Sequence, residues 1–449
     1  MTYNDVLTEN EKHMIVTKFG GSSLADSAQF RKVKEIIDAD SRRCVVVVSA
    51  PGKRGADDNK ITDLLYTLDG HLRYGVPDDK IWDSIAGRYT EIAKSLGLSI
   101  DIDAELRAFA KTLGKNTDQS LLVSRGEYFC ARLMSAYLGF AFVDAADVIR
   151  FSFDGRLDLE TSARLVREAF DSHGSLVVPG FYGAYPNGDI HLFSRGGSDI
   201  TGSYLARFLN AEIYENWTDV SGIYSADPRL AKNPKPIERI TYEELRELSY
   251  MGANVLHEDS ILPVQDCGIA INIRNTNEPD NDGTVITRDA GEGTPVTGIA
   301  GKKGFISFVI HKKHMSGEIG FLRKVLTVFE GYGINVEHIP TGMDVISVIV
   351  LEEQAARHVH AIISEIESTL GAQVTVDRNL SLIAIVGRNM AGRYGISASV
   401  FGIFGQNGIN IKVIVQSPDE LNIIVGIDAE HHERAIGCLY DGLCTAGLL

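Results

Sequence analysis

Hydrophobic positions along the chain follow two patterns, short continuous apolar runs and longer stretches in which apolar residues recur with a helical period. Continuous runs without alternation are typical of parallel strands that are covered on both faces. These runs stand at residues 14–19, 43–49, 175–181 and 211–217. The helical stretches stand at residues 28–37, 61–109, 128–138 and 200–209. Because the two kinds of segment alternate, they predict an α/β domain with a mostly parallel sheet, which ends near Thr294.

The last third of the chain contains an internal repeat. Eight residues recur at a constant spacing of 75 positions, from 317 to 392 and from 339 to 414, and Met315 matches Met390. The repeated residues are Gly317, Gly320, Val325, Phe329, Gly333, Ile334, Asn335 and Ile339. Each copy reads as a strand, a Gly-rich turn, a helix, a Gly-Ile-Asn turn and a strand, which is a βαβ-type module. Two copies are too few for a solenoid, so the repeat predicts a tandem pair of small α/β domains.

Length, charge and cysteine usage narrow the class of protein. A chain of 449 residues is too long for one ordinary core, so two or three domains are expected. A net charge of −16 argues against binding to a phosphate backbone, so we expect no nucleic-acid partner. The five cysteines are scattered and lack metal-site spacing, which favours a reduced chain. The N-terminus is polar and no apolar run reaches membrane-spanning length, so we expect a cytoplasmic protein without a membrane partner.

Two glycine pairs, Gly20-Gly21 and Gly196-Gly197, follow predicted strands and precede predicted helices. Backbone N–H groups in such turns, together with the dipole of the following helix, favour an anion. Lys18, at the end of the first strand, would add a full positive charge. An ordinary β-to-α turn with a solvated lysine is the alternative for either pair alone. The chain has neither GxxxxGK[ST] nor a GxGxxG after a strand, so we expect two helix N-termini to converge on one polyphosphate.

Four motifs, in this order, resemble those of the aspartate kinases, which belong to the amino acid kinase family. The motifs are Lys18-Phe19-Gly20-Gly21-Ser22-Ser23, Ser124-Arg125-Gly126-Glu127, Arg195-Gly196-Gly197-Ser198-Asp199 and the segment 218–229. The tandem repeat is similar to the two ACT domains that follow the kinase domain in that family. The resemblance implies a kinase domain at 1–295 and βαββαβ-type ACT domains at 296–378 and 379–449. It also implies a homodimer or homotetramer formed through the ACT domains.

The resemblance assigns a role to each motif residue. Lys18 would contact the transferring phosphoryl oxygens, and Asp199 would organise that lysine and the metal-nucleotide. A plain helix N-cap is the alternative for Asp199, which could also serve as both. Arg195 would hold the α-carboxylate of the substrate and Glu127 its α-amino group. Further substrate contacts are implied for Ser49, Thr62, Phe181 and Ser198. Nucleotide contacts are implied for Lys18, Gly20, Gly21, Ser22, Thr218, Asp219, Tyr224, Arg229 and Asn254.

Asn254 departs from the family pattern, which often has a lysine there to contact nucleotide phosphates. An amide can donate a hydrogen bond but carries no charge. Either another cation compensates, with Lys232 and Lys235 nearby in sequence, or nucleotide affinity is weaker. The departure does not imply a loss of function, because Lys18, Asp199 and Arg195 are all present.

The implied reaction is ATP-dependent phosphorylation of the side-chain carboxylate of L-aspartate to 4-phospho-L-aspartate, with Mg²⁺ bound to the nucleotide and no separate protein metal site. This is the first step of lysine, threonine and methionine biosynthesis. The substrate carboxylate is ionised at pH 7, so its attack on the γ-phosphate needs no general base. Another amino acid kinase, acting on glutamate, acetylglutamate or a nucleotide, is the nearest alternative. A catalytically silent amino-acid sensor is the alternative from another class, against which the Lys18 and Asp199 pair argues.

In ACT-like pairs a small effector usually sits where the first turn of one repeat meets a strand of another. The residues so implied are Met315, Gly317, Gly320, Phe321, Leu322, Asn335, Val336 and Glu337. Glu337 offers a counter-charge to an amino group, whereas the second repeat has Lys412 at the matching position. We therefore expect an amino-acid effector at the first repeat, lysine in the first place and threonine as the alternative. The alternative for Glu337 is a solvated strand residue.

Overall fold

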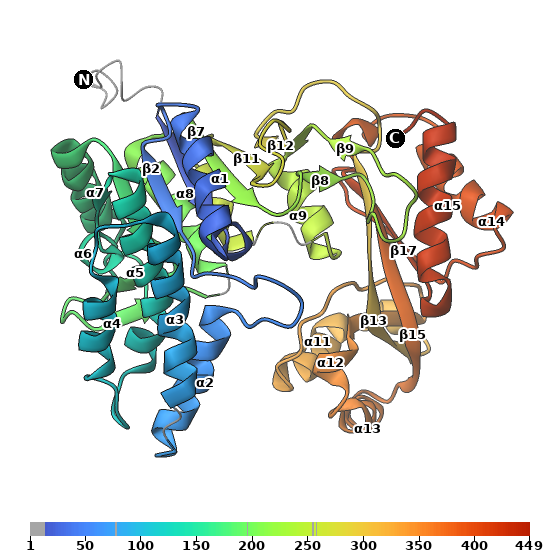
Figure 1. Cartoon of the computed structure of the whole chain (residues 1–449). Helices are drawn as coiled ribbons and strands as arrows, with labels where there is room; N and C mark the ends of the chain where they lie inside the picture. The colour runs from blue at the N-terminus through green and yellow to red at the C-terminus, as the bar shows by residue number, and fades with distance from the viewer. Residues whose placement is uncertain (1–13, 77–78, 195, 254–255, 257) are drawn as a thin grey trace, which may run out of the picture. The chain divides into compact units, whose positions relative to one another are not determined.

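The computed structural model describes residues 14–76, 79–194, 196–253, 256 and 258–449 (Figure 1). These residues form two compact units. The first unit extends to Ile223 and also includes Glu238–Tyr242 and the segment that ends at Ala290. The second contains Tyr224–Ile237, the segment that begins at Glu243, and Gly291–Leu449. None of the helices in the described ranges is long and apolar enough to cross a membrane.

An eight-stranded sheet forms the centre of the first unit, in the order β10-β12-β11-β7-β1-β2-β4-β3. Its strands are β1 (Ile15–Phe19), β2 (Val45–Val48), β3 (Ala141–Phe142), β4 (Leu176–Pro179), β7 (Ile213–Thr218), β10 (Arg239–Thr241), β11 (Ala270–Asn275) and β12 (Thr284–Thr287). Neighbouring strands are parallel throughout except for the antiparallel pair of β11 and β12. Two short pairs lie outside it, β5 (Tyr182–Ala184) with β6 (Ile190–Leu192) and β8 (Ile223–Tyr224) with β9 (Pro236–Ile237). The mostly parallel sheet predicted from the sequence is confirmed.

Helices cover both faces of this sheet. The helices are α1 (Ser27–Asp38), α2 (Ile61–Arg73), α3 (Asp79–Leu96), α4 (Ile102–Ala110), α5 (Gln119–Leu138), α6 (Ala145–Val148), α7 (Leu159–His173), α8 (Gly197–Leu209) and α10 (Leu262–Gln265). Apolar side chains of α1 to α5 pack with Phe19, Val48 and Trp217 in one buried core. On the opposite face α8 approaches β7 so closely that a Cβ on Gly202 would come within 2.7 Å of the Tyr214 ring. The strands therefore carry buried side chains on both faces, as their continuous apolar runs predict.

Helix α5 begins earlier than the sequence pattern predicts. Asp118 caps it, because its carboxylate accepts a hydrogen bond from the Leu121 N–H at 2.9 Å. The motif Ser124–Glu127 therefore lies inside the helix, and the prediction that it precedes the helix is wrong. Gly126 stands in the helix interior because a Cβ there would come within 2.9 Å of the Ala50 Cβ. The glycine allows α5 to approach the segment Ser49-Ala50, which follows β2.

The second unit is built on a five-stranded antiparallel sheet, in the order β14-β13-β15-β17-β16. Its strands are β13 (Gly298–His311), β14 (Val345–Leu351), β15 (Gln373–Val386), β16 (Val413–Gln416) and β17 (Asn422–Asp428). Its helices are α11 (Phe321–Gly331), α12 (Glu352–Ala355), α13 (Val359–Leu370), α14 (Ile396–Gln406) and α15 (His432–Thr445), and α9 (Tyr242–Tyr250) joins this unit after its first residue. The two long strands β13 and β15 each serve both repeats.

The internal repeat is confirmed by the position of its helices. Helix α11 spans 321–331 and α14 spans 396–406, so both ends differ by the same 75 positions as the sequence repeat. Each helix follows a glycine with a positive φ, 76° at Gly320 and 88° at Gly395, a conformation that L side chains rarely adopt. The two repeats have separate apolar cores.

The two cores divide the long strands between them. Val374 and Val376, in the first half of β15, pack in the first core, whereas Ile383 and Ile385 pack in the second. The N-terminal part of β13 pairs with the C-terminal part of β15 and contributes Ile299 to the second core. The predicted boundary between residues 378 and 379 thus falls inside one continuous strand, and the domain boundaries stay a prediction.

Candidate active site

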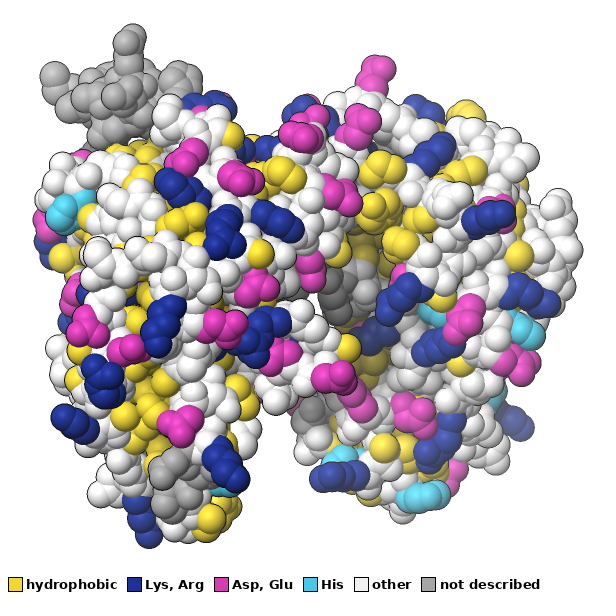
Figure 2. Space-filling model, viewed as in Figure 1, with side chains coloured by type: hydrophobic (Ala, Val, Ile, Leu, Met, Phe, Trp, Pro, Cys, Tyr) yellow, Lys and Arg dark blue, Asp and Glu magenta, His cyan; other side chains and the backbone are white. Residues whose placement is uncertain are grey.

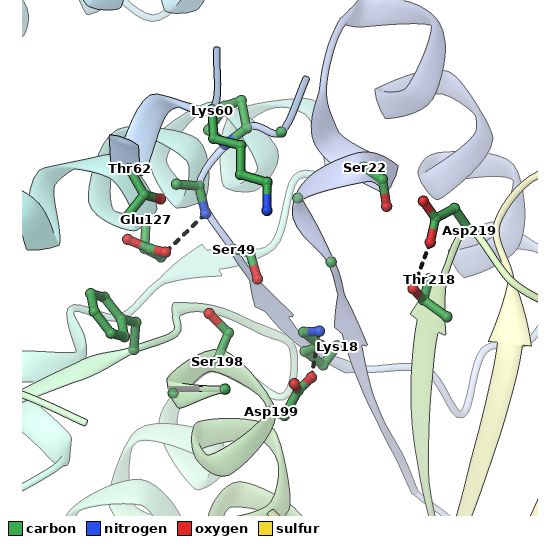
Figure 3. Close-up of a pocket in the computed structure, with 18 of the residues that line it drawn as sticks. Lys18, Ser22, Ser49, Lys60, Thr62, Glu127, Ser198, Asp199, Thr218 and Asp219 are labelled. Atoms are coloured by element: carbon green, nitrogen blue, oxygen red, sulfur yellow. Dashed lines mark hydrogen bonds and ion pairs between the residues drawn. The ribbon is translucent and has the colours of Figure 1, made fainter. Parts of the chain in front are cut away.

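The carboxyl ends of β1, β2, β4 and β7 surround one cavity of about 630 Å³ with the first turns of α2 and α8. In open α/β sheets, ligands bind at this edge of the strands. In Figure 3, Thr62 and Glu127 lie at one side of the cavity, Thr218 and Asp219 lie at the other, and Lys18 and Asp199 lie between them. The cavity therefore has two ends with a charged pair between them, which suits two substrates that react with each other.

Lys18 is buried at the end of β1 and is 7% exposed. Its ammonium group forms an ion pair with Asp199 on α8 and lies 3.4 Å from the Asn216 Oδ1 on β7. The Asn216 amide also donates to the Asp199 carboxylate at 2.8 Å. Lys18 and Asn216 are aligned in the pairing of β1 with β7, so their side chains face the same side of the sheet. Helix α8 covers that side, and both side chains can therefore reach Asp199. Two residues that are distant from Lys18 in sequence, Asp199 and Asn216, thus hold the lysine in one position.

Glycine turns form the walls on either side of this lysine. Gly20 donates its N–H to the Trp217 carbonyl at 2.9 Å, and a 3₁₀ turn, Gly21–Leu24, comes next. The helix predicted at residues 28–37 is confirmed, since α1 spans Ser27–Asp38, and the 3₁₀ turn, which begins at the second glycine of the pair, precedes it. Gly21 touches a second turn, since a Cβ on it would come within 2.8 Å of the Ala50 carbonyl oxygen.

The second glycine pair does open an α-helix. Gly196, with a φ of 75°, occupies the N-cap of α8, so Asp199 is not the cap but lies in the first turn. The first N–H groups of an α-helix have no partner within the helix and carry its positive dipole end. Gly196 and Gly197 line the cavity, so this end of α8 can bind an anion there.

Glu127 lies at the other end of the cavity and is 4% exposed. Its Oε1 accepts a hydrogen bond from the Ala50 N–H at 3.1 Å, whereas its Oε2 has no hydrogen-bond partner among the described residues. Burial raises the pKa of Glu127 to about 8. A buried carboxylate oxygen that lines a cavity without a partner suits a cationic group of a ligand, such as an ammonium.

Phe181 lines the same region in a strained backbone conformation. Its φ of 80° is rare for a residue with a side chain and costs of order 1–3 kcal/mol. The surrounding structure enforces it, because the Phe181 N–H donates to the Thr201 hydroxyl at 3.0 Å and its ring packs against Gly197. Such strain at a cavity is typical of a position fixed for ligand contact.

Most of the residues singled out in the sequence meet in this cavity. Those that line it are Lys18, Gly20, Gly21, Ser22, Ser49, Thr62, Glu127, Phe181, Ser198, Asp199, Thr218 and Asp219. Arg195 and Asn254 lie outside the described residues. Tyr224 and Arg229 belong to the second unit, where Arg229 pairs with Asp227 at 2.6 Å.

The structure adds site residues that the sequence did not indicate. Asn216, which contacts Lys18 and Asp199, could have been noticed as a polar residue inside a buried strand. Gly52, Lys53 and Lys60 line the cavity, but they come from a loop whose glycines and charges look like an ordinary surface segment. Lys235, one of the cations expected to compensate for Asn254, instead donates to the Leu449 carbonyl at 3.0 Å.

The residues proposed to bind an effector lie in the second unit. Met315 is buried in a 3₁₀ turn, Met315–Gly317, that leads to α11. The strand predicted at 335–337 does not form as such, and among the described residues isolated bridges join His338 to Ile349 and Thr341 to Ile346 in β14. The Glu337 carboxylate accepts a hydrogen bond from the Tyr250 hydroxyl at the end of α9.

Charged side chains of both signs are interspersed over the face of the molecule shown in Figure 2. Among the described residues, no group of three or more His, Cys, Asp or Glu side chains has the arrangement of a metal site.

Comparison with known proteins gives a consistent result over nearly the whole chain. The sequence pattern of the amino acid kinase family matches residues 13–275, and that of the ACT domain matches residues 383–443. Aspartokinase 3 of Bacillus subtilis is 37% identical, over 95% of this chain and 98% of its own length.

Two solved structures agree with this relationship. The crystal structure of Clostridium acetobutylicum aspartate kinase has a TM-score of 0.88 at 44% identity and covers 96% of this chain and 99% of its own. Escherichia coli aspartokinase III, in complex with lysine and aspartate, has a TM-score of 0.74 at 25% identity, with 96% and 99% covered. The chain belongs to the amino acid kinase family and, within it, to the aspartokinases that carry ACT domains.

Proposed function

We propose that this aspartate kinase transfers the γ-phosphoryl group of ATP to the side-chain carboxylate of L-aspartate and so forms 4-phospho-L-aspartate. The observation that supports it most directly is the cavity in which the Lys18 and Asp199 pair lies between Glu127 and Thr218. The amino acid would bind at the Glu127 end, with its ammonium on the Oε2 that has no partner. The nucleotide would bind at the Thr218 end, with its phosphates toward the glycine turns.

The chemistry in this cavity is positioning and charge neutralisation. Both reactants are anions, so their approach is opposed by Coulomb repulsion. Lys18 offers its ammonium where phosphoryl charge develops, and its fixed contacts with Asp199 and Asn216 mean that little reorganisation is needed during reaction. The turn at Gly20-Gly21 and the start of α8 supply backbone N–H groups to the same oxygens. Arg195, which precedes α8 in sequence, remains our proposal for the α-carboxylate.

Mg²⁺ fits the donor set of this cavity. Besides Glu127 at the other end, the carboxylates of Asp199 and Asp219 line it, and Mg²⁺ is usually held by one or two carboxylates together with substrate phosphates. When bound with the nucleotide, the ion would neutralise phosphate charge. Because Asp199 already pairs with Lys18, Asp219 is the carboxylate that we propose for this contact.

A hydroxamate assay tests this proposal. Hydroxylamine traps acyl phosphates, so the purified enzyme is incubated with ATP, Mg²⁺ and one of three acceptors, aspartate, glutamate or acetylglutamate. We expect hydroxamate from aspartate and background signal from the other two. Turnover confined to glutamate or acetylglutamate would reassign the substrate, and none with any acceptor would favour the silent amino-acid sensor.

An acyl phosphate at this position is an activated carboxyl group, and we propose that it feeds lysine, threonine and methionine biosynthesis.

We also propose that an amino acid, lysine in the first place, inhibits the enzyme through the first repeat. The solved structure of the Escherichia coli relative contains lysine. In the second repeat the matching groups are already bound internally. The Gly392 N–H donates to the Glu420 carboxylate at 2.9 Å, and Lys412 pairs with Asp377 at 2.8 Å and with Asp428. The first repeat instead presents Glu337. Among the described residues, its carboxylate accepts a hydrogen bond from the Tyr250 hydroxyl and forms no ion pair.

Glu337→Ala should raise the lysine concentration needed for half-inhibition by about 10-fold or more, because a hydrogen bond to a charged group contributes about 1.5–3 kcal/mol. The uninhibited kcat should stay unchanged. Inhibition is measured at subsaturating aspartate, and Lys412→Ala is the matched control in the second repeat, for which no change is expected. Equal lysine inhibition in wild type and Glu337→Ala would show that the effector binds elsewhere, and threonine is tested in parallel.

A further inference from the structure

The cations of the active-site cavity are of two kinds. Lys18 is buried and already neutralised by Asp199. Lys53 and Lys60 also line the cavity, and within the described residues neither side chain makes a hydrogen bond or an ion pair. A nucleotide triphosphate brings several negative charges into this space. The described residues that can supply positive charge without giving up an existing partner are therefore these two lysines.

Both lysines belong to the loop between β2 and α2, and buried Arg88 anchors this loop. The Arg88 guanidinium donates to the Gly52 carbonyl at 2.9 Å and to the Asp58 carboxylate at 2.7 Å. Asp58 also accepts from the Arg54 N–H at 2.9 Å. The hydrogen bond to the Gly52 carbonyl fixes the loop near its start. The two hydrogen bonds to Asp58 fix it near its end, two residues before Lys60. The other cation in this segment, Arg54, pairs with Asp58 and Glu91, which leaves the lysines as its unpaired cations.

Lys60 is the better placed of the two. Its carbonyl accepts from the Leu64 N–H at 3.1 Å, and the next residue, fully buried Ile61, donates to the Pro51 carbonyl at 3.2 Å. The backbone at Lys60 is thus fixed by the first turn of α2. Lys53, in contrast, is followed by exposed residues 54–57. In Figure 3 the Lys60 side chain points into the cavity from the side opposite to Lys18 and Asp199, with Ser49 between them.

We propose that Lys60 is a second phosphate-binding cation, which contacts the β- and γ-phosphate oxygens of the nucleotide from the side opposite to Lys18. This inference rests on the proposed function, since it assumes that a nucleotide occupies this cavity. Two cations on opposite sides neutralise a polyanion without competing for the same oxygens. A lysine without a partner suits this role, because its ammonium gives up no ion pair when the phosphates bind.

The test compares Lys60→Gln with Lys53→Gln as the matched control and Lys60→Arg as the conservative variant, all in the full-length chain. Initial rates are measured with varied ATP at saturating aspartate and with varied aspartate at saturating ATP. The dissociation constant of a non-hydrolysable ATP analogue with Mg²⁺ is measured by calorimetry. For Lys60→Gln we expect kcat/KM for ATP to fall by about 10- to 100-fold and the analogue to bind correspondingly more weakly. The KM for aspartate should change by less than about threefold, and Lys53→Gln should lose clearly less kcat/KM for ATP than Lys60→Gln does.

Lys60→Arg should retain most of the activity because it keeps the charge. A Lys60→Gln enzyme with kcat/KM for ATP within about threefold of wild type would overturn the proposal. An equal loss in Lys53→Gln would also overturn it, since that would assign the effect to the total charge of the loop. If wild type itself forms no acyl phosphate, the proposed function fails, and analogue binding still decides whether Lys60 binds phosphate.

Discussion

Replacing Lys18 by methionine should lower kcat by at least about 10²–10³-fold, the usual cost of removing one fixed group that stabilises developing charge. The side chain fits the space of the lysine but cannot neutralise a phosphoryl oxygen. KM values should change much less than kcat, because the loss is greatest in the transition state. Steady-state rates with ATP and aspartate measure both quantities.

A second variant separates catalysis from folding. Lys18→Met leaves Asp199 without its cation, although Asp199 keeps the Asn216 hydrogen bond and is 18% exposed at its side chain. Combining Lys18→Met with Asp199→Asn removes the uncompensated charge, so this double variant should recover any loss of thermal stability but none of the activity. If Lys18→Met had a kcat within a few-fold of wild type, Lys18 would not hold the role that its position suggests.

The second large effect concerns Glu127 and pH. Because burial raises the pKa of Glu127 to about 8, this carboxyl is mostly neutral at pH 6–7 in the free enzyme. An ammonium group of the substrate binds the ionised form best. The apparent KM for aspartate should therefore fall as pH rises, by about tenfold per unit below the pKa, and level off above it. Glu127→Gln should raise KM at pH 8.5 by about 10-fold or more and remove most of this pH dependence.

The same group predicts a dependence of stability on pH. A carboxyl with a raised pKa holds its proton in the folded state at pH values where the unfolded chain has lost it. Stability contributed by the neutral form is therefore present below the unfolded pKa and lost as pH rises toward 8. Between pH 5 and pH 8, the Tm of Glu127→Gln should accordingly rise relative to that of wild type.

For the binding role of Glu127, the contradicting result is a KM for aspartate with the same pH profile in wild type and Glu127→Gln. That result would contradict the assignment of Glu127 to the substrate ammonium.

Local sequence patterns predicted the elements that carry most of the site. The strand that carries Lys18 and the helix at residues 28–37 follow from an apolar run and a helical period, which are properties of neighbouring residues. The equal spacing of α11 and α14 followed from the repeat alone. The meeting of Lys18 and Asp199 was expected from the family resemblance rather than from local pattern, since the residues are far apart in the chain.

What the sequence missed depends on contacts between distant segments. The apolar period predicts a helix only from Tyr128, but Gly126 makes room for Ala50, so the helix passes through Ser124–Glu127. Asn216 joins the lysine pair only because β7 lies beside β1. Lys60 reaches the cavity because Arg88, on α3, holds its loop. The short strand expected at 335–337 does not form, because the described residues of this segment join β14 only through the Glu337 N–H and isolated bridges at His338 and Thr341.

The central claim is that the cavity around Lys18 joins the γ-phosphoryl group to a carboxylate oxygen of aspartate. Isotope transfer tests this directly. The enzyme is given ATP, Mg²⁺, hydroxylamine and aspartate labelled with ¹⁸O in its side-chain carboxylate, and the released phosphate is examined by ³¹P NMR. Hydroxylamine attacks the carbonyl carbon of the acyl phosphate and expels phosphate, which keeps the bridging oxygen. We predict phosphate that carries one ¹⁸O atom, formed in step with hydroxamate. Unlabelled phosphate would mean that water attacks ATP instead, and would contradict the assigned reaction.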